Sequence, residues 1–188
     1  MVQMSHTVFR YAKKVDWHSL LMGGLMIIFA FVMVFHLGDQ VKQFSIIMGL
    51  VAILKGFLNF NYYSILRGLP DKTLHSLFLV SGIMSVLFGL FIIFSFSATN
   101  NLLSVICGFW FIWDYIPQIF LNELKFVNHH RLLILFRAIE VLSIICGVVL
   151  MLQSFMTFIN PMIFAIIYYF LSGGSLLWEN YRLSKKRS

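Results

Sequence analysis

Four charged residues stand inside long apolar stretches of this sequence, and they are the first candidates for chemistry. Asp114 lies in FWFIWDYIPQIF, Lys55 precedes Gly56, and Glu140 follows Arg137 by three residues. A charged side chain near the centre of a membrane helix costs roughly 2.5 to 3.5 kcal/mol, so it faces the bundle interior or reaches an interface. These four residues are therefore predicted to form an intramembrane charge layer.

The spacing of the charges suggests how they pair. Aligning Gly49 with Gly108, an offset of 59 residues, places Lys55 on Asp114. Glu140 has Arg137 on the same helix face as its candidate partner. Lys55, Asp114 and Glu140 each lie seven or eight residues from the expected cytoplasmic end of a helix, which puts them roughly 10 to 12 Å above that boundary.

Two interpretations of this layer remain open at the level of sequence. Paired charges can hold helices in register, since polar contacts between membrane helices contribute on the order of 0.6 to 2 kcal/mol. Alternatively, buried carboxylates can carry protons or sense acid, as ionisable groups inside membranes often do. His129 and His130 form a second candidate for pH sensing, because histidine gains charge below about pH 6.5; the alternative is two solvated loop histidines.

Composition identifies the medium that surrounds these residues. The 188 residues are 60% hydrophobic, 17% aromatic and 11% charged, and the mean hydropathy is +0.89. A soluble domain has roughly 25% charged residues. A membrane-spanning helix needs about 20 mostly apolar residues, and six stretches qualify: approximately 17–37, 43–63, 74–97, 102–121, 132–153 and 158–178. The sequence predicts an all-α integral membrane protein with six transmembrane helices in a single membrane domain, 1–188.

The basic residues predict the orientation of the helices. Twelve of the 14 Lys and Arg residues fall on one side of the expected topology, whereas Lys42 alone falls on the other. By the positive-inside rule, both termini are cytoplasmic. The net charge of +7 is scattered over helix ends without a basic stripe, which argues against nucleic acid as a partner. The expected partners are membrane lipids, and a second copy of the chain or another membrane protein.

The sequence also contains a weak internal repeat. WHSLLMGGLM at Trp17 resembles LHSLFLVSGIM at Leu74, and further glycines recur at offsets of 58 or 59. Three helical hairpins are implied, at approximately 17–66, 74–124 and 132–181, related by an axis along the membrane normal. Small residues spaced by four, Ser85-x3-Gly89 and Ser143-x3-Gly147, predict close helix contacts. The first helix is expected to make its contact through Gly23 and Gly24.

A family resemblance follows from these features. Three tandem two-helix hairpins, the Trp17-x6-Gly24 start and the glycine spacing of the odd helices resemble the HdeD-type acid-resistance membrane proteins, a bacterial family. The resemblance covers roughly residues 17–178. It implies a role in the bacterial cytoplasmic membrane under acid or envelope stress, with no catalytic residues to transfer.

Motifs for enzyme chemistry are missing. The sequence has no GxSxG, HExxH or GxxxxGK[ST] pattern, and Cys107 and Cys146 lie in apolar runs without the spacing of a metal site. We therefore expect a non-enzymatic multi-pass membrane protein without cofactors or a metal, acting in stress resistance. The alternatives are a small proton-linked permease or channel that uses Lys55, Asp114 and Glu140, and an accessory subunit of a larger membrane complex.

Overall fold

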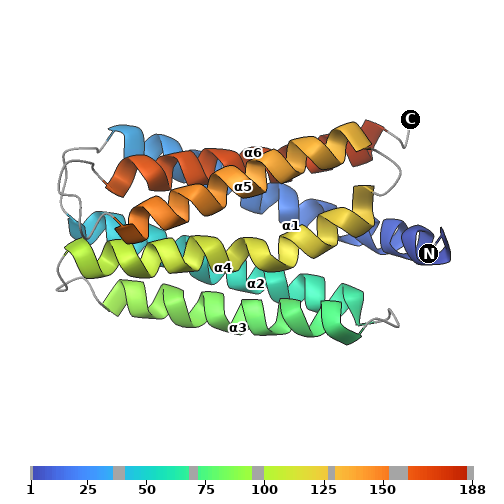
Figure 1. The fold of residues 1–188 in the computed structure, drawn as a ribbon, viewed down its shortest axis with the longest axis horizontal. Coiled ribbons are helices and arrows are strands. Elements are labelled where there is room, and N and C mark those ends of the chain that lie inside the picture. Colours follow the sequence, from blue (N-terminus) through green and yellow to red (C-terminus); the bar gives the residue numbers. More distant parts are fainter. Residues whose placement is uncertain are drawn as a thin grey trace.

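The part of the chain that the structure describes forms a bundle of six long helices (Figure 1). The computed structural model describes residues 2–35, 41–67, 72–94, 100–126, 130–152 and 161–185, and side chains within 17–35, 45–67, 73–94, 102–122, 132–152 and 162–181. The helices are α1 (Val2–Phe35), α2 (Val41–Leu66), α3 (Lys72–Phe94), α4 (Asn100–Phe126), α5 (His130–Leu152) and α6 (Pro161–Lys185).

Each helix contains one segment that is long and apolar enough to cross a membrane. These segments are Trp17–Phe35, Ser45–Leu66, Thr73–Phe94, Leu102–Asn122, Leu132–Leu152 and Met162–Tyr181. Among the described residues, the prediction of six helices that can span a membrane is confirmed, and the chain is a multi-pass membrane protein. The second span extends three residues beyond its expected end. The last helix begins at Pro161, a position where the missing N–H of proline costs no helical hydrogen bond.

Successive helices run antiparallel, so the start of α1 and the end of α6 lie at the same end of the bundle (Figure 1). We call this the termini end and the opposite one the far end. The most extensive interfaces do not follow the expected hairpins. Helix α2 packs mainly on α3, α4 on α5, and α1 on α6. The last of these contacts closes the bundle between its first and last helices.

Pairs of facing glycines make these three interfaces close. A Cβ placed on Gly89 would lie 2.6 Å from the carbonyl oxygen of Gly49, a separation that a real side chain does not adopt. The facing pairs are Gly49 and Gly89, Gly56 and Gly82, Gly108 and Gly147, and Gly23 and Gly173. Small residues allow membrane helices to approach until their backbones touch. The expected contact through Gly23 is confirmed, whereas the one through Gly24 is wrong, because nothing lies within 4 Å of its Cβ position.

The interior of the bundle is partly polar, and its outer surface is apolar. Lys55, Asp114 and Glu140 are all buried, as are large aromatic side chains such as Trp110 and Tyr168. Many leucine, isoleucine, valine and phenylalanine side chains are exposed on the helix faces that point outward. This distribution is expected for a protein surrounded by lipid, because polar and charged groups are costly in hydrocarbon whereas apolar side chains are not.

Candidate functional site

The centre of the site is a buried ion pair that joins α2 to α4. Lys55 Nζ lies 2.6 Å from Asp114 Oδ2, and the two side chains are 2% and 0% exposed. The expected pairing of these residues is present in the structure. A third helix contributes as well, since the hydroxyl of Tyr168 on α6 donates a hydrogen bond to the same oxygen at 2.7 Å.

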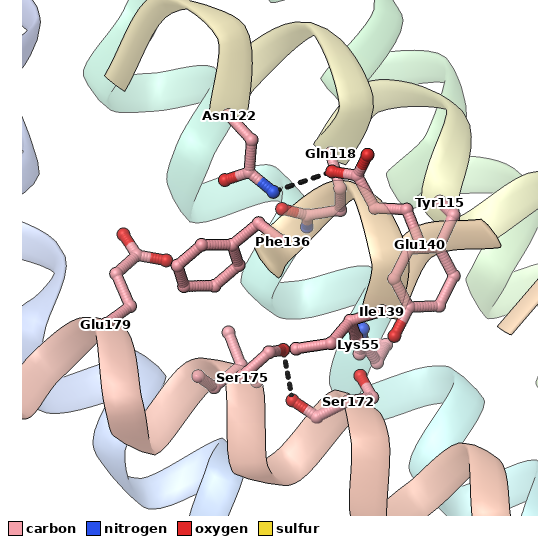
Figure 2. Close-up of a pocket in the computed structure, with 11 residues that line it drawn as sticks. Lys55, Tyr115, Gln118, Asn122, Phe136, Ile139, Glu140, Ser172, Ser175 and Glu179 are labelled. Atoms are coloured by element: carbon pink, nitrogen blue, oxygen red, sulfur yellow. Dashed lines mark hydrogen bonds between the residues drawn. The ribbon is translucent and has the colours of Figure 1, made fainter. Parts of the chain in front are cut away.

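The second carboxylate, Glu140 on α5, has a different set of neighbours. Asn122 on α4 donates a hydrogen bond from Nδ2 to Glu140 Oε1 at 2.7 Å, as Figure 2 shows. Arg137 Nη1 lies 3.5 Å from Oε2, and its side chain is 33% exposed. The expected contact with Arg137 therefore exists, but the shorter contact comes from an amide that the sequence interpretation did not include.

A small polar pocket connects the two charged groups (Figure 2). It lies between α2, α4, α5 and α6 and encloses about 20 Å³. That volume is sufficient for one water molecule, which needs roughly 10 to 15 Å³ measured in this way. Its lining residues are Lys55, Tyr115, Gln118, Asn122, Phe136, Ile139, Glu140, Ser172, Ser175, Leu176 and Glu179.

Two buried polar atoms in and beside this pocket have no hydrogen-bond partner. They are Gln118 Nε2, which belongs to a lining residue, and Asp114 Oδ1. The Tyr115 hydroxyl, in contrast, lies close enough to Ser143 and Ser172 to interact with both. Buried polar groups in proteins are almost always paired. The site therefore has unused capacity to donate and accept hydrogen bonds.

An aromatic layer, consisting of Trp110, Phe111 and Tyr168, lies on the far-end side of the ion pair. The rings of Phe111 and Tyr168 are stacked, with centroids 3.7 Å apart and planes inclined by 5°, and the centroid of Trp110 lies 5.6 Å from that of Tyr168. All three side chains are fully buried. The layer separates Asp114 from the far end of the bundle.

Polar residues follow one another from the ion pair toward the termini end. Asp114, Gln118 and Asn122 recur every four residues on α4, so they share one helix face. Glu179 on α6 lies at the same end of the pocket. Pro117 has no N–H to bond the carbonyl oxygen of Trp113. That carbonyl oxygen is therefore one more polar group on this part of α4. The site as a whole is thus polar toward the termini end and aromatic toward the far end.

The site occupies a position that is filled by glycines elsewhere. Gly56 faces Gly82 between α2 and α3. Residues 59 positions after Gly56 and 58 positions after Gly82 are Tyr115 and Glu140, on α4 and α5. At the equivalent position of α4 and α5, two bulky polar side chains therefore replace the glycines that let the α2 and α3 backbones touch. The polar pocket lies beside them.

The remaining sequence candidates do not join this site. His129 lies outside the described residues, and His130 begins α5 with a side chain outside the described set, so pH sensing there stays a prediction. Cys107 and Cys146 are buried free thiols. Among the described residues, no three His, Cys, Asp or Glu side chains are arranged to hold a metal ion.

Tyr168, Ser172 and Asn122 are the members of the site that sequence reasoning missed. Sequence signals existed for Ser172 and Asn122, but not for Tyr168. Ser172 lies 58 residues after Asp114, close to the offset that relates Lys55 to Asp114, and Asn122 continues the four-residue spacing of Asp114 and Gln118.

Comparisons with the models of known protein families, with curated proteins and with solved structures found no match. The function is therefore inferred from the residues of the site and from their surroundings.

Proposed function

We propose that this chain is a non-enzymatic multi-pass membrane protein that conducts protons through the layer of Lys55, Asp114 and Glu140. In this proposal it acts as a small proton-linked permease or channel. The two carboxylates bind and release the proton, while Lys55 and Arg137 balance their charge. The polar pocket, which Glu140 and Lys55 line, lies on the proton's route.

One observation carries the proposal: Glu140 and Lys55, which is paired with Asp114, line one pocket whose polar atoms are only partly paired. Charges that only held helices together would be expected to have all their hydrogen-bonding capacity satisfied, since each unpaired buried group costs about 1 to 3 kcal/mol. A proton path, in contrast, requires donors and acceptors that can change partners. Intramembrane acids that face a bundle interior often serve in such paths.

The resemblance to HdeD-type proteins suggests the setting of this activity. We place the protein in the bacterial cytoplasmic membrane, as three hairpin repeats with both termini in the cytoplasm. The termini end of the bundle is then the cytoplasmic end, and the polar side of the pocket faces the cytoplasm. A role in acid or envelope stress would follow from the control of proton entry.

Proton flux into liposomes tests the proposal directly. The purified chain is reconstituted with a trapped pH-sensitive dye, and a pH gradient is imposed with the membrane potential clamped. We expect flux above that of protein-free liposomes. Asp114→Asn combined with Lys55→Met, and Glu140→Gln alone, should each lower it by about a hundredfold, the usual contribution of a positioned proton-transfer group.

Two results would contradict the proposal. Wild-type protein that conducts no more protons than empty liposomes would exclude proton conduction. Flux that persists in both the Asp114→Asn/Lys55→Met and Glu140→Gln variants would show that the charge layer only holds the helices. The folding of each variant is checked by circular dichroism and thermal unfolding in detergent.

A further inference from the structure

A second and larger cavity lies between α1 and α2 and shares no lining residue with the polar pocket. It encloses about 360 Å³, which is within the range of roughly 300 to 1,000 Å³ for small-molecule sites. Two of its lining side chains, Leu21 and Phe57, are 48% and 60% exposed, so the cavity opens on the outer surface of the bundle. We call it the α1–α2 groove; it is lined by His18, Leu21, Met22, Leu25, Leu54, Phe57, Leu58 and Asn61.

The α1–α2 groove is polar at one end and apolar along the rest of its length. His18 and Asn61 lie toward the termini end, whereas Leu25 and Leu54 are each seven residues deeper, which is about 10 Å along a helix axis. Trp17 precedes His18 and is 66% exposed, and exposed tryptophans gather at the membrane interface. The polar groups of the groove therefore lie at the level of lipid headgroups, and its apolar walls lie at the level of acyl chains.

The amide of Asn61 has an unused hydrogen-bond donor in this groove. Its Nδ2 is buried and has no partner among the described residues, so this nitrogen loses no bond when the amide turns into the groove. The residues next to His18 and Asn61 differ in this respect, because Ser19 Oγ and the hydroxyl of Tyr62 are hydrogen-bonded to each other at 3.2 Å. Buried donors in proteins are almost always paired. Asn61 thus lacks an acceptor oxygen, which a molecule in the groove can supply.

The helix face that lines the groove continues into a basic position on α1. Lys14 precedes His18 by four residues, so the two positions belong to the same face of the helix. Asp16 is two residues from His18 and therefore belongs to the opposite face. A negatively charged group at the polar end of the groove is thus placed on the basic face of α1 and away from the acidic one.

We propose that the α1–α2 groove binds one anionic phospholipid. An acyl chain lies along Leu25 and Leu54, an ester or phosphate oxygen accepts a hydrogen bond from Asn61, and the basic face of α1 balances the charge of the headgroup. Apolar contact alone does not select a lipid, because the surrounding bilayer offers the same contact. The selectivity of the site therefore resides in its polar end. The site is independent of proton conduction.

Native mass spectrometry of the purified chain in detergent tests the site. The protein is titrated with phosphatidylglycerol or with phosphatidylcholine that has the same acyl chains. We expect one phosphatidylglycerol to bind, about tenfold more tightly than phosphatidylcholine. Asn61→Leu should weaken its binding by about tenfold, which corresponds to the loss of one hydrogen bond to a charged group. Leu21→Trp, which places a larger side chain in the groove, should weaken it at least as much.

Ile28→Trp is the matched control for Leu21→Trp. Ile28 lies seven residues after Leu21 on the same face of α1, is 58% exposed and does not line the groove. This variant introduces the same large side chain on the lipid-facing surface, and it should bind phosphatidylglycerol as the wild type does. Circular dichroism and thermal unfolding in detergent check that each variant is folded, and Asn61→Leu decides the question if Leu21→Trp does not fold.

Three results would overturn the proposal. Equal affinity of the wild type for the two phospholipids would exclude selection of an anionic headgroup. Wild-type affinity for phosphatidylglycerol in folded Leu21→Trp or in Asn61→Leu would exclude the groove as the site. An equal loss in Leu21→Trp and Ile28→Trp would assign the effect to the outer surface in general. Selective binding that depends on the groove, in a protein that conducts no protons, would support this site and exclude only the proposed function.

Discussion

The α2–α3 and α4–α5 interfaces use the same close packing and differ at one position along their length. Between α2 and α3, two glycine pairs bring the backbones together, Gly49 with Gly89 and Gly56 with Gly82. Between α4 and α5, Gly108 meets Gly147 in the same manner, but the corresponding second contact is replaced by Tyr115 and Glu140. One interface is closed along its length, and the other opens into a polar pocket.

This difference shows how a bundle of similar helices can acquire a site. Small residues supply contact energy in a medium where the hydrophobic effect gives none, so an interface made of glycines is dry and tight. Between α4 and α5, the large polar side chains of Tyr115 and Glu140 line a pocket, while Gly108 and Gly147 hold the two helices close nearer the far end. The interface that contains the site therefore differs from the closed α2–α3 interface by the absence of one glycine pair.

Breaking the ion pair of Lys55 and Asp114 should have the largest effect on the free energy of unfolding. Asp114→Leu leaves Lys55 buried without its partner, and breaking such a pair typically costs about 3 to 5 kcal/mol. We expect the free energy of unfolding in detergent, measured by denaturant titration with circular dichroism, to fall by this amount. Adding Lys55→Met should restore most of the loss, because replacing both charges by apolar groups is often neutral. A single variant as stable as the wild type would contradict the pairing.

Removing the Asn122 amide, which donates a hydrogen bond to Glu140, should have the next largest effect on the free energy of unfolding. Asn122→Ala removes a hydrogen bond to a buried carboxylate, which is worth about 1.5 to 3 kcal/mol. Asn59→Ala is the comparison from the other interface, since Asn59 donates to the neutral hydroxyl of Ser81 at 3.1 Å, a bond worth about 0.5 to 1.5 kcal/mol. The same denaturant titration measures both. A larger loss from Asn59→Ala would reverse the expected order of the two interfaces.

The closed interface can be opened by a single methyl group. In Gly89→Ala the new Cβ would approach both the Gly49 carbonyl oxygen and the Ile53 backbone nitrogen, at 2.6 and 2.9 Å. Overpacking of this kind costs about 1 to 3 kcal/mol.

Gly24→Ala and Gly174→Ala are the matched controls, because nothing lies within 4 Å of either Cβ position. They should be as stable as the wild type or slightly more so, since alanine favours helix over glycine. If all three variants unfold at the same temperature in detergent, glycine contact does not hold α2 and α3 together.

The smallest effect is expected at the edge of the site. Arg137 is one-third exposed and lies 3.5 Å from Glu140, and exposed ion pairs typically contribute between 0 and about 1 kcal/mol. Arg137→Gln should therefore change the free energy of unfolding by less than Asn122→Ala does. A loss close to that of Asp114→Leu would mean that Arg137 is the main partner of Glu140.

The number of helices and the ion pair were readable from the sequence for different reasons. Length and hydropathy determine a membrane-spanning helix almost by themselves, so all six were found. Lys55 and Asp114 were paired because an isolated charge is costly in lipid and the glycine spacing placed them on equivalent positions. Both inferences rest on the properties of single helices and on one offset.

The rest of the site depends on how helices distant in sequence pack together. The contact of α6 with α1, through Gly173 and Gly23, follows from the closure of the whole bundle, and no local pattern indicates it. Tyr168 reaches Asp114 only because that closure brings α6 against α4. Tyr168 lies in an apolar segment of α6, and a tyrosine in such a segment is expected to be an ordinary core residue.

The distance in sequence between Lys55 and Asp114 has a consequence for biosynthesis. The two residues are 59 positions apart, so at 5 to 20 residues per second the lysine is made about 3 to 12 seconds before the aspartate. During that interval α2 has a charge that costs roughly 2.5 to 3.5 kcal/mol at the centre of a bilayer. Pairing with Asp114 can offset this cost only after α4 has been made, so α2 carries an unpaired charge until then.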